Sequence, residues 1–255
     1  MNLGFIGTGK IASSVITGIS NSNIKYNQII ISSRNKKIAL YLRKKFKKVS
    51  ISESNQEIVD KSDWVFLSVT PSVGQRIIKN LKFKSKQIVI SFISTITLSQ
   101  LKKLIKKKID IVRAIPLPPI SLREGPIPIC PPNKKVKAFF NKLGSTVEIK
   151  NEKLSINFWS TSGLMASYYN MLNVISIWLN KKGVNKLDAQ KYVTSLFLAL
   201  SKDAVINSNK DLKLLIKDSQ TPKGLNEQGL KEMIKKNVYK SITSTLNSIY
   251  KRLNK

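Results

Sequence analysis

The chain has 255 residues and a formal net charge of +31, from 45 Lys and Arg against 14 Asp and Glu. A chain of this length can form two domains, each with a hydrophobic core of its own. Neither a signal-peptide pattern at Met1 to Ile19 nor an apolar run of membrane-spanning length is present, and the single cysteine, Cys130, can form no internal disulfide. These features exclude a disulfide scaffold and predict a soluble protein of the reducing cytoplasm, with no membrane partner.

The positive charge would ordinarily favour a nucleic-acid partner, because lysine and arginine neutralise phosphates. Only six of the 45 basic residues are Arg, and the lysines are spread over almost every predicted helix. No aromatic stacking platform or zinc-ligand spacing accompanies them, so no metal site is expected. We therefore expect no specific nucleic-acid binding, only non-specific association that salt weakens.

The chain opens with a strand, a glycine turn and a helix. Leu3 to Ile6 is apolar, Gly7-Thr8-Gly9-Lys10-Ile11-Ala12 follows directly, and a helix continues to Ile19. In a dinucleotide fingerprint Gly7 allows the tight turn, Gly9 lets backbone amides approach a pyrophosphate, and Ala12 lets the helix pack on the strand. The helix N-terminus adds electrostatic attraction for phosphate. We predict a cofactor-binding turn formed by Gly7, Thr8, Gly9, Lys10 and Ile11.

The second strand, Gln28 to Ser33, indicates which cofactor is used. NAD-selective folds place an Asp or Glu near its end to accept the ribose hydroxyls, whereas here the end reads Ser33-Arg34-Asn35-Lys36. A basic residue at this place suits a 2′-phosphate. We therefore predict NADPH, with NADH possible, and Ser33, Arg34 and Asn35 as ribose-side residues.

The rest of the first half alternates strands and helices. Strands are expected at Val49 to Ile51, Trp64 to Val69, Gln87 to Ile93, Ile109 to Ile115, Gly125 to Cys130 and Thr146 to Ile149; helices at Lys36 to Phe46, from Gln56, and at Val73 to Leu81, Ser99 to Lys106 and Lys134 to Leu143. This order predicts an α/β fold with a doubly wound, Rossmann-type sheet in residues 1–150. Ligands of such sheets bind at the carboxyl ends of strands, so Val69, Thr70 and Pro71 are expected beside the cofactor.

Residues 151–255 are expected to form an all-α domain. Helices are predicted at Leu154 to Lys181, Leu187 to Val205, Leu212 to Lys217 and Leu230 to Leu253. The first is apolar on most of its circumference, and such a helix must be buried on several sides. A small domain cannot do this alone, so a partner subunit is implied.

Several motifs in order resemble those of pyrroline-5-carboxylate reductases. Besides the opening turn, they are the strand ending in Val69-Thr70-Pro71, the segment Ser91 to Thr97, Val112-Arg113-Ala114-Ile115-Pro116, Ser162-Gly163 and Thr221-Pro222-Lys223-Gly224. The resemblance covers nearly the whole chain. It implies a dinucleotide domain, a helical dimerisation domain interlocked with a second subunit, often in a ring of dimers, and NAD(P)H-dependent reduction of a cyclic imine that carries a carboxylate.

The resemblance also implies where a substrate would bind. The carboxylate would lie at the turn Thr221 to Gly224, where amides and the Thr221 hydroxyl can donate and Lys223 adds charge. Gly163 would let the substrate approach closely, or would serve only helix packing, and Ser162 stands beside it. Asn226 could hydrogen-bond the imine nitrogen and act with Ser162 at the catalytic centre, and Glu227 could pair with a cationic substrate.

Departures from the family pattern cluster on the substrate side. Thr70 replaces a Lys, Leu117 an Asn, Leu164-Met165 a Pro-Ala pair, and Leu225 to Gln228 the segment that holds a Thr. The leading hypothesis is reduction of 1-pyrroline-5-carboxylate to L-proline. The alternatives are a family relative acting on another imine or keto substrate, a β-hydroxyacid dehydrogenase, and a noncatalytic cofactor-binding or basic interaction protein.

Overall fold

The structure, a computed structural model, describes residues 1–254. Its internal contacts divide the chain into two compact units, Met1–Ser155 and Ile156–Lys255. Each unit is described by itself.

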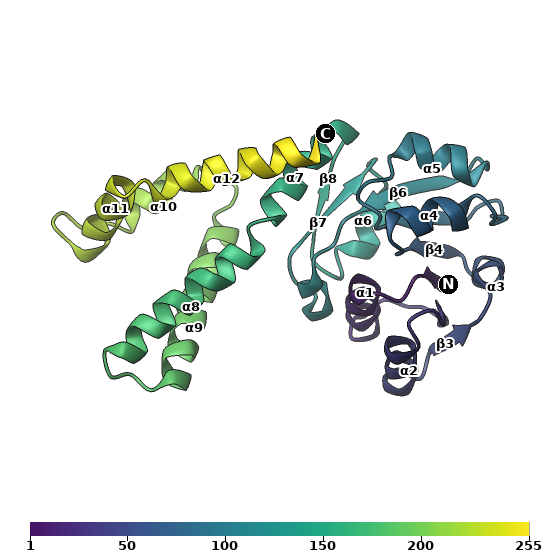
Figure 1. The fold of residues 1–255 in the computed structure, drawn as a ribbon, viewed down its shortest axis with the longest axis horizontal. Helices are drawn as coiled ribbons and strands as arrows, with labels where there is room; N and C mark the ends of the chain where they lie inside the picture. The colour runs from purple at the N-terminus through teal and green to yellow at the C-terminus, as the bar shows by residue number, and fades with distance from the viewer. Residues whose placement is uncertain (255) are drawn as a thin grey trace. The chain divides into compact units, whose positions relative to one another are not determined.

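The first unit is built on one eight-stranded sheet with the order β3-β2-β1-β4-β5-β6-β7-β8 (Figure 1). Its strands are β1 (Asn2–Ile6), β2 (Gln28–Ser32), β3 (Val49–Ser52), β4 (Trp64–Leu67), β5 (Ile88–Ser91), β6 (Asp110–Ala114), β7 (Pro126–Cys130) and β8 (Ser145–Glu148). Its helices are α1 (Lys10–Ser20), α2 (Lys36–Lys45), α3 (Asn55–Lys61), α4 (Pro71–Ile78), α5 (Leu98–Ile105) and α6 (Lys134–Phe140), with short 3₁₀ turns η1 (Pro118–Leu122) and η2 (Glu152–Leu154).

Alternate residues of the central strands face two separate cores. On β1, Leu3 and Phe5 join one cluster and Ile6 the other. The first cluster packs buried side chains of α1, α2 and α6 against the sheet, and the second packs those of α3, α4 and α5. Strands buried on both faces need continuous apolar runs, as the sequence has. The predicted doubly wound sheet is confirmed.

Strand β7 reverses the direction of the sheet. The strands from β3 to β6 are parallel, β7 is antiparallel to β6, and β8 is parallel to β7. The connection from β6 to β7 holds only a 3₁₀ turn, which is too short for the crossover that a parallel strand requires.

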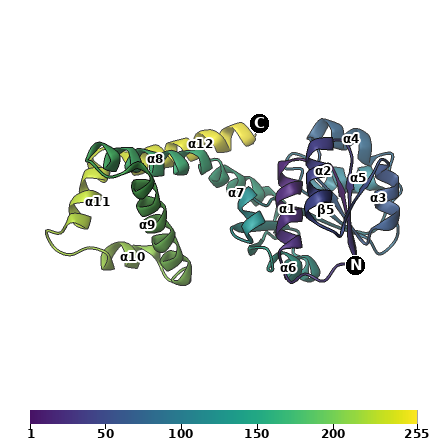
Figure 2. The ribbon, with the colours of Figure 1, turned by 90° about the horizontal axis from the view of Figure 1, so that it is seen from below.

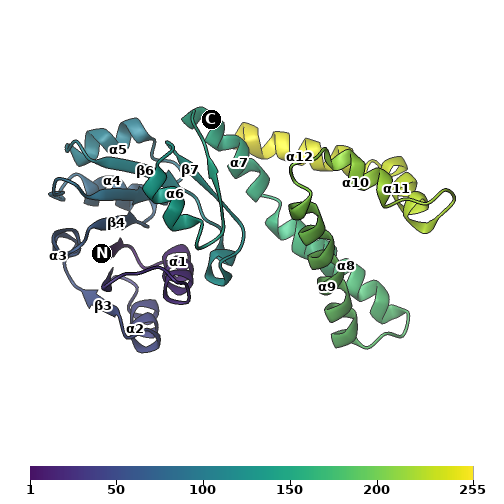
Figure 3. The same ribbon diagram turned by 180° about the vertical axis from the view of Figure 1, so that it is seen from behind.

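The second unit consists of helices. They are α7 (Ser155–Ser162, which begins at the unit boundary), α8 (Met165–Lys181), α9 (Lys186–Ile206), α10 (Leu212–Asp218), α11 (Leu225–Lys235) and α12 (Val238–Leu253). Helices α8 and α9 pack as a hairpin (Figure 3), and α10 and α11 follow in order (Figure 2). Among the described residues, no helix has the length and apolarity needed to cross a bilayer.

Two predicted helices are each divided in the structure. The prediction of one helix over Leu154 to Lys181 was wrong, because the helix is interrupted at Gly163. The Gly163 amide donates to the Ser160 carbonyl, three residues back, at 3.1 Å. Ile249 of α12 packs against this break, and a Cβ on Gly163 would lie 2.8 Å from its Cδ1. The prediction of one helix over Leu230 to Leu253 was also wrong, because α11 ends at Lys235 and Asn237, in a left-handed conformation with φ 56°, precedes α12. Asn tolerates this conformation better than most residues.

The helical unit leaves many large apolar side chains exposed within one chain. Trp178 of α8 is 57% exposed and Leu200 of α9 is 56% exposed. Within the described part of α8 and α9, only Ser176, Ala189 and Val193 are buried. Apolar exposure of this extent along two neighbouring helices is typical of an assembly surface.

An ion pair with a buried arginine joins β6, the loop after β5 and the turn η2 in the first unit. Arg113 is only 4% exposed, and its guanidinium pairs with the carboxylate of Glu152 and donates to the Ser94 carbonyl. The same Glu152 oxygen accepts from the Leu98 amide at 2.8 Å, at the start of α5. Glu152 therefore holds the last turn of the first unit against the sheet.

We predict that Glu152→Ala lowers the free energy of unfolding by about 3 kcal/mol, because it leaves the buried Arg113 charge without its carboxylate. Glu148→Ala is the matched control. It removes the half-exposed pair between Lys137 and Glu148 and should cost less than about 1 kcal/mol. Urea unfolding of both variants measures the difference, and equal losses would contradict the role given to Glu152.

Candidate functional site

The turn between β1 and α1 can be made only with glycine at its first position. Gly7 has φ +101°, a conformation that L side chains rarely adopt, and a Cβ there would lie 2.3 Å from the Ser68 carbonyl oxygen. The same Cβ would meet Val69 Cγ1 at 2.7 Å. Gly7 therefore lets the ends of β1 and β4 approach closely.

Gly9, unlike Gly7, faces open space. It is the N-cap of α1, with φ −84° and ψ −171°, which other residues can adopt, and a Cβ there would meet nothing within 4 Å. No side chain caps this helix N-terminus, and its first turn carries no acidic residue. Uncapped amides facing open space are what a pyrophosphate requires, so this turn fits a dinucleotide.

Hydrogen bonds tie the turn to the end of β2. The Gly7 amide donates to Ser32 Oγ at 2.9 Å, and the buried Thr8 hydroxyl donates to the Ser32 carbonyl at 2.5 Å. Of the predicted cofactor residues, Thr8 is thus a structural link, whereas Lys10 is exposed and Ile11 is half-buried at the helix start. The two strand ends that should face a dinucleotide are fixed to one another.

The ribose-side residues gather at the carboxyl end of β2. Arg34 is exposed, and the Asn35 side chain caps α2 by accepting from the Ile38 amide at 3.3 Å. The Ser33 hydroxyl donates to Glu53 Oε2 at 2.6 Å. Sequence reasoning missed Glu53, because it searched for an acid only after β2. The predicted strand at Val49 to Ile51 places Glu53 just beyond a strand end, but only the pairing of β2 with β3 brings its carboxylate to Ser33.

Residues Val69 to Pro71 link β4 to α4. The strand ends at Leu67, two residues before the predicted end. Val69 is partly buried against the second core cluster, and Thr70 is the N-cap of α4 with Pro71 at its first position. Thr70 makes no side-chain capping hydrogen bond. The structure brings Val69 to the Gly7 turn.

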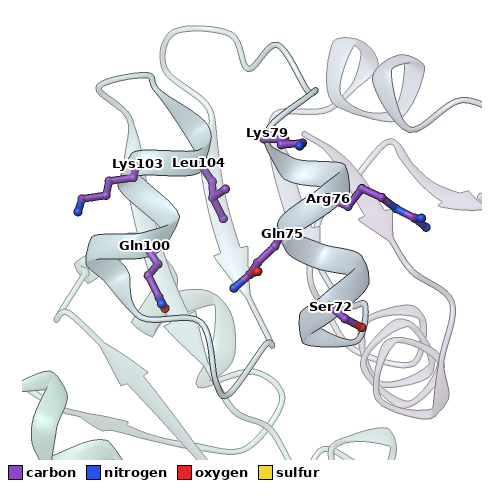
Figure 4. Close-up of a pocket in the computed structure, with 7 residues that line it drawn as sticks. All are labelled: Ser72, Gln75, Arg76, Lys79, Gln100, Lys103 and Leu104. Carbon is purple, nitrogen blue, oxygen red and sulfur yellow. The ribbon is translucent and has the colours of Figure 1, made fainter.

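A hollow in the first unit lies between α4 and α5 and includes Ser72, the residue after Pro71. It has a volume of about 500 Å³ and is lined in part by Gln75, Gln100 and Leu104. Figure 4 shows Gln75 pointing into the gap, whereas Arg76 and Lys103 point away from it. The cations therefore do not converge on a common point, and this hollow is not the candidate site.

Cys130 is not a candidate nucleophile, and the described residues hold no candidate metal site. Cys130 is 3% exposed at the end of β7, and burial raises the pKa of its thiol. A buried neutral thiol is a poor nucleophile. Within residues 1–254, no group of three or more His, Cys, Asp or Glu side chains could hold a metal ion.

The turn Thr221 to Gly224 in the helical unit is tightly closed. The Gly224 amide donates to the Thr221 carbonyl at 2.8 Å, and a Cβ on Gly224 would lie 2.2 Å from Thr221 Oγ1. Lys223 has φ +60°, a left-handed conformation that favours glycine. The resemblance places a family glycine at this position, and the backbone conformation explains why.

Glu227 already occupies part of this turn. Its Oε2 accepts from the Lys223 amide at 2.6 Å, and its Oε1 pairs with Lys231 at 2.5 Å. These bonds lower the pKa of Glu227, with Lys231 the larger cause, so that the side chain is charged at neutral pH. A substrate carboxylate at the Lys223 amide would have to displace it.

The two predicted catalytic side chains make local hydrogen bonds. Asn226 Nδ2 donates to the Ser219 carbonyl at 2.8 Å, and the Ser162 hydroxyl donates to the Phe158 carbonyl at 3.1 Å. Asn226 lies in the first turn of α11, beside Thr221 to Gly224, whereas Ser162 ends α7 next to Gly163. Their catalytic roles stay predictions.

Comparisons with known proteins point to one family. The family model for pyrroline-5-carboxylate reductase dimerisation matches residues 157–255, and the model described as NADP oxidoreductase coenzyme F420-dependent matches residues 2–95. A pyrroline-5-carboxylate reductase of a Synechocystis species is 26% identical over an alignment covering 99% of this chain and 97% of that protein. The chain belongs to the pyrroline-5-carboxylate reductase family.

Other relatives agree with this assignment. Pyrroline-5-carboxylate reductase 3 of Danio rerio is 31% identical over 128 residues, which cover 49% of this chain and 44% of that protein. The solved structure of Plasmodium falciparum pyrroline carboxylate reductase with NADP bound shares the fold, with a TM-score of 0.83, 22% identity, and coverage of 99% of this chain and 97% of that one. The match of the helical unit to a dimerisation family indicates that this member also forms an oligomer.

The two glycines of the first turn give a matched pair of variants. We predict that Gly9→Val leaves the free energy of unfolding within about 1 kcal/mol of the parent and abolishes dinucleotide binding, because its side chain fills open space before α1. Gly7→Ala should instead destabilise the protein by about 2 kcal/mol or more, through its positive φ and the Ser68 clash. Denaturant unfolding and titration with NADPH separate the two effects. Unchanged NADPH affinity of Gly9→Val would remove this turn from the site.

Proposed function

We propose that this protein reduces 1-pyrroline-5-carboxylate to L-proline with NADPH as the hydride donor. The observation that carries the proposal is the match of residues 157–255 to the dimerisation domain of pyrroline-5-carboxylate reductases. Nucleotide-binding sheets occur in many kinds of reductase, so the sheet alone does not indicate a substrate. The match of the helical domain is specific to one family of reductases. The Synechocystis pyrroline-5-carboxylate reductase, aligned over 99% of this chain, supports it.

On this proposal the first unit holds the cofactor. The α1 N-terminus would bind the pyrophosphate at Gly7, Thr8 and Gly9, with Lys10 and Ile11 flanking it. Ser33, Arg34 and Asn35 would face the ribose, and Val69 to Pro71 the nicotinamide end. The open space before Gly9 supports the first of these assignments.

The second unit would hold the substrate. Thr221, Lys223 and Gly224 would bind its carboxylate, with the Lys223 amide exchanging Glu227 for the ligand. Asn226 would hydrogen-bond the ring nitrogen, and Ser162 with Gly163 would line the approach. Glu227 retains Lys231 as a partner when it gives up the Lys223 amide.

The proposed reaction depends more on the orientation of cofactor and substrate than on acid–base groups of the protein. Bound NADPH would supply a hydride to the carbon of the C=N bond, and the protonated nitrogen would accept the electron pair of that bond to become the amine. Because an iminium already carries its proton, no histidine is needed. The protein's task is to orient the two reactants and to neutralise a carboxylate.

We also propose a homodimer through the helical unit, as the exposed apolar side chains of α8 and α9 favour. Dimers of this kind could associate further into a ring. The cytoplasmic location expected from the lone cysteine is part of the same proposal.

A second candidate function is reduction of a different imine or a keto compound. Glu227 favours it, because a charged carboxylate at the substrate turn repels an anionic substrate and would attract a cationic one. This alternative keeps the cofactor site unchanged and alters only the substrate.

The deciding experiment follows NADPH absorbance on addition of 1-pyrroline-5-carboxylate to the purified protein, with NADH run in parallel. We expect rapid oxidation of NADPH and formation of proline. NADPH binding without turnover would reject this substrate and favour the second candidate, which a panel of cyclic imines and keto compounds that carry no carboxylate would then test. Failure to bind either cofactor would reject both functions.

Arg34→Ala should weaken NADPH binding about tenfold or more and change NADH binding less than about twofold, because a guanidinium contributes mainly to a 2′-phosphate. Dissociation constants from titration of each cofactor measure this. Equal losses for both cofactors would show that Arg34 does not contact the 2′-phosphate.

A further inference from the structure

An acidic side chain lies beside the strand end where the ribose would bind. Strands β2 and β3 pair in parallel with Ser32 opposite Ser52, so the next position along each strand brings Ser33 beside Glu53. The Ser33 hydroxyl donates to Glu53 Oε2 at 2.6 Å. Glu53 is exposed, so its carboxylate remains open to a ligand.

This position is where dinucleotide folds discriminate between their cofactors. In such folds the end of the second strand faces the adenosine ribose, and a carboxylate there accepts from its hydroxyls. The same carboxylate repels a 2′-phosphate. Glu53 reaches this place from the neighbouring strand, and the Ser33 hydroxyl orients it.

Cations surround the same place. A hollow of about 230 Å³ is lined by Ser33, Glu53, Lys36 and Arg43, among others. Arg34 precedes Lys36 at the start of α2, and both are exposed. The pocket therefore presents cations suited to a 2′-phosphate together with one anion suited to a 2′-hydroxyl.

We propose that Glu53 is a specificity-determining residue that limits the preference for NADPH over NADH. This rests on the proposed function, because it concerns the cofactor of that reaction. Glu53 accepts a hydrogen bond from the 2′-hydroxyl of NADH and opposes the 2′-phosphate of NADPH, while the cations at the start of α2 act in the other direction. The preference for NADPH is consequently smaller than the cations alone would give.

The test is Glu53→Gln, which removes the charge but keeps an oxygen that can accept from Ser33. Dissociation constants for NADPH and NADH are measured on the full-length protein by the fluorescence of the bound nicotinamide, at fixed ionic strength. We expect the ratio of the two constants to shift toward NADPH by about tenfold or more. Glu148→Gln is the matched control, because it removes the same charge from β8, at the opposite edge of the sheet from β3.

The outcomes separate the two proposals. A shift in Glu53→Gln with none in Glu148→Gln supports the inference. Parent protein that binds both cofactors, with an unchanged ratio in Glu53→Gln, overturns the role of Glu53 and leaves the proposed function standing. Parent protein that binds neither cofactor overturns the proposed function and this inference with it.

Discussion

The first unit depends on the close approach of two strand ends at Gly7. Only a residue without a Cβ can lie against the Ser68 carbonyl in a left-handed conformation, and this contact lets β1 and β4 end side by side. The Gly7 amide and the Thr8 hydroxyl then bind Ser32, which adds the end of β2 to the same cluster. With three strand ends fixed, α1 begins where its uncapped amides face open space. The fold of the first unit and its candidate site thus both depend on the glycine at position 7.

The electrostatic interactions that shape this protein are short-range contacts, although its net charge is +31. Three carboxylates make these contacts, and strand pairing or loop closure brings each to its partner. Glu53 contacts Ser33, Glu152 pairs with Arg113, and Glu227 accepts from the Lys223 amide. In each case a carboxylate accepts from a specific donor in a basic surrounding. Most lysines lie on exposed helix faces, where solvent and salt screen them.

Within residues 156–254, the helical unit has no hydrophobic core enclosed by its own chain, whereas the first unit has two. Large side chains such as Trp178 and Leu200 stay more than half exposed within one protomer. Burying this apolar surface is the main source of free energy available to such helices, so assembly and folding of this unit are connected. The breaks at Gly163 and Asn237 divide two long segments of this unit into shorter helices, and Ile249 of α12 packs at the first break.

The sequence by itself determined the alternation of strands and helices, the glycine turn and the order of family motifs. These are local properties, since apolar runs and the conformational needs of Gly7 are readable within a few residues. It did not determine that the helices are interrupted near Gly163 and Asn237. The hydrophobic periodicity continues across a break that packing makes, such as the packing of Ile249 on Gly163. The sequence also did not reveal Glu53, which lies twenty residues from Ser33 in the chain. Only the parallel register of β2 and β3 brings the two together, because hydrogen bonding between strands is decided by the tertiary structure.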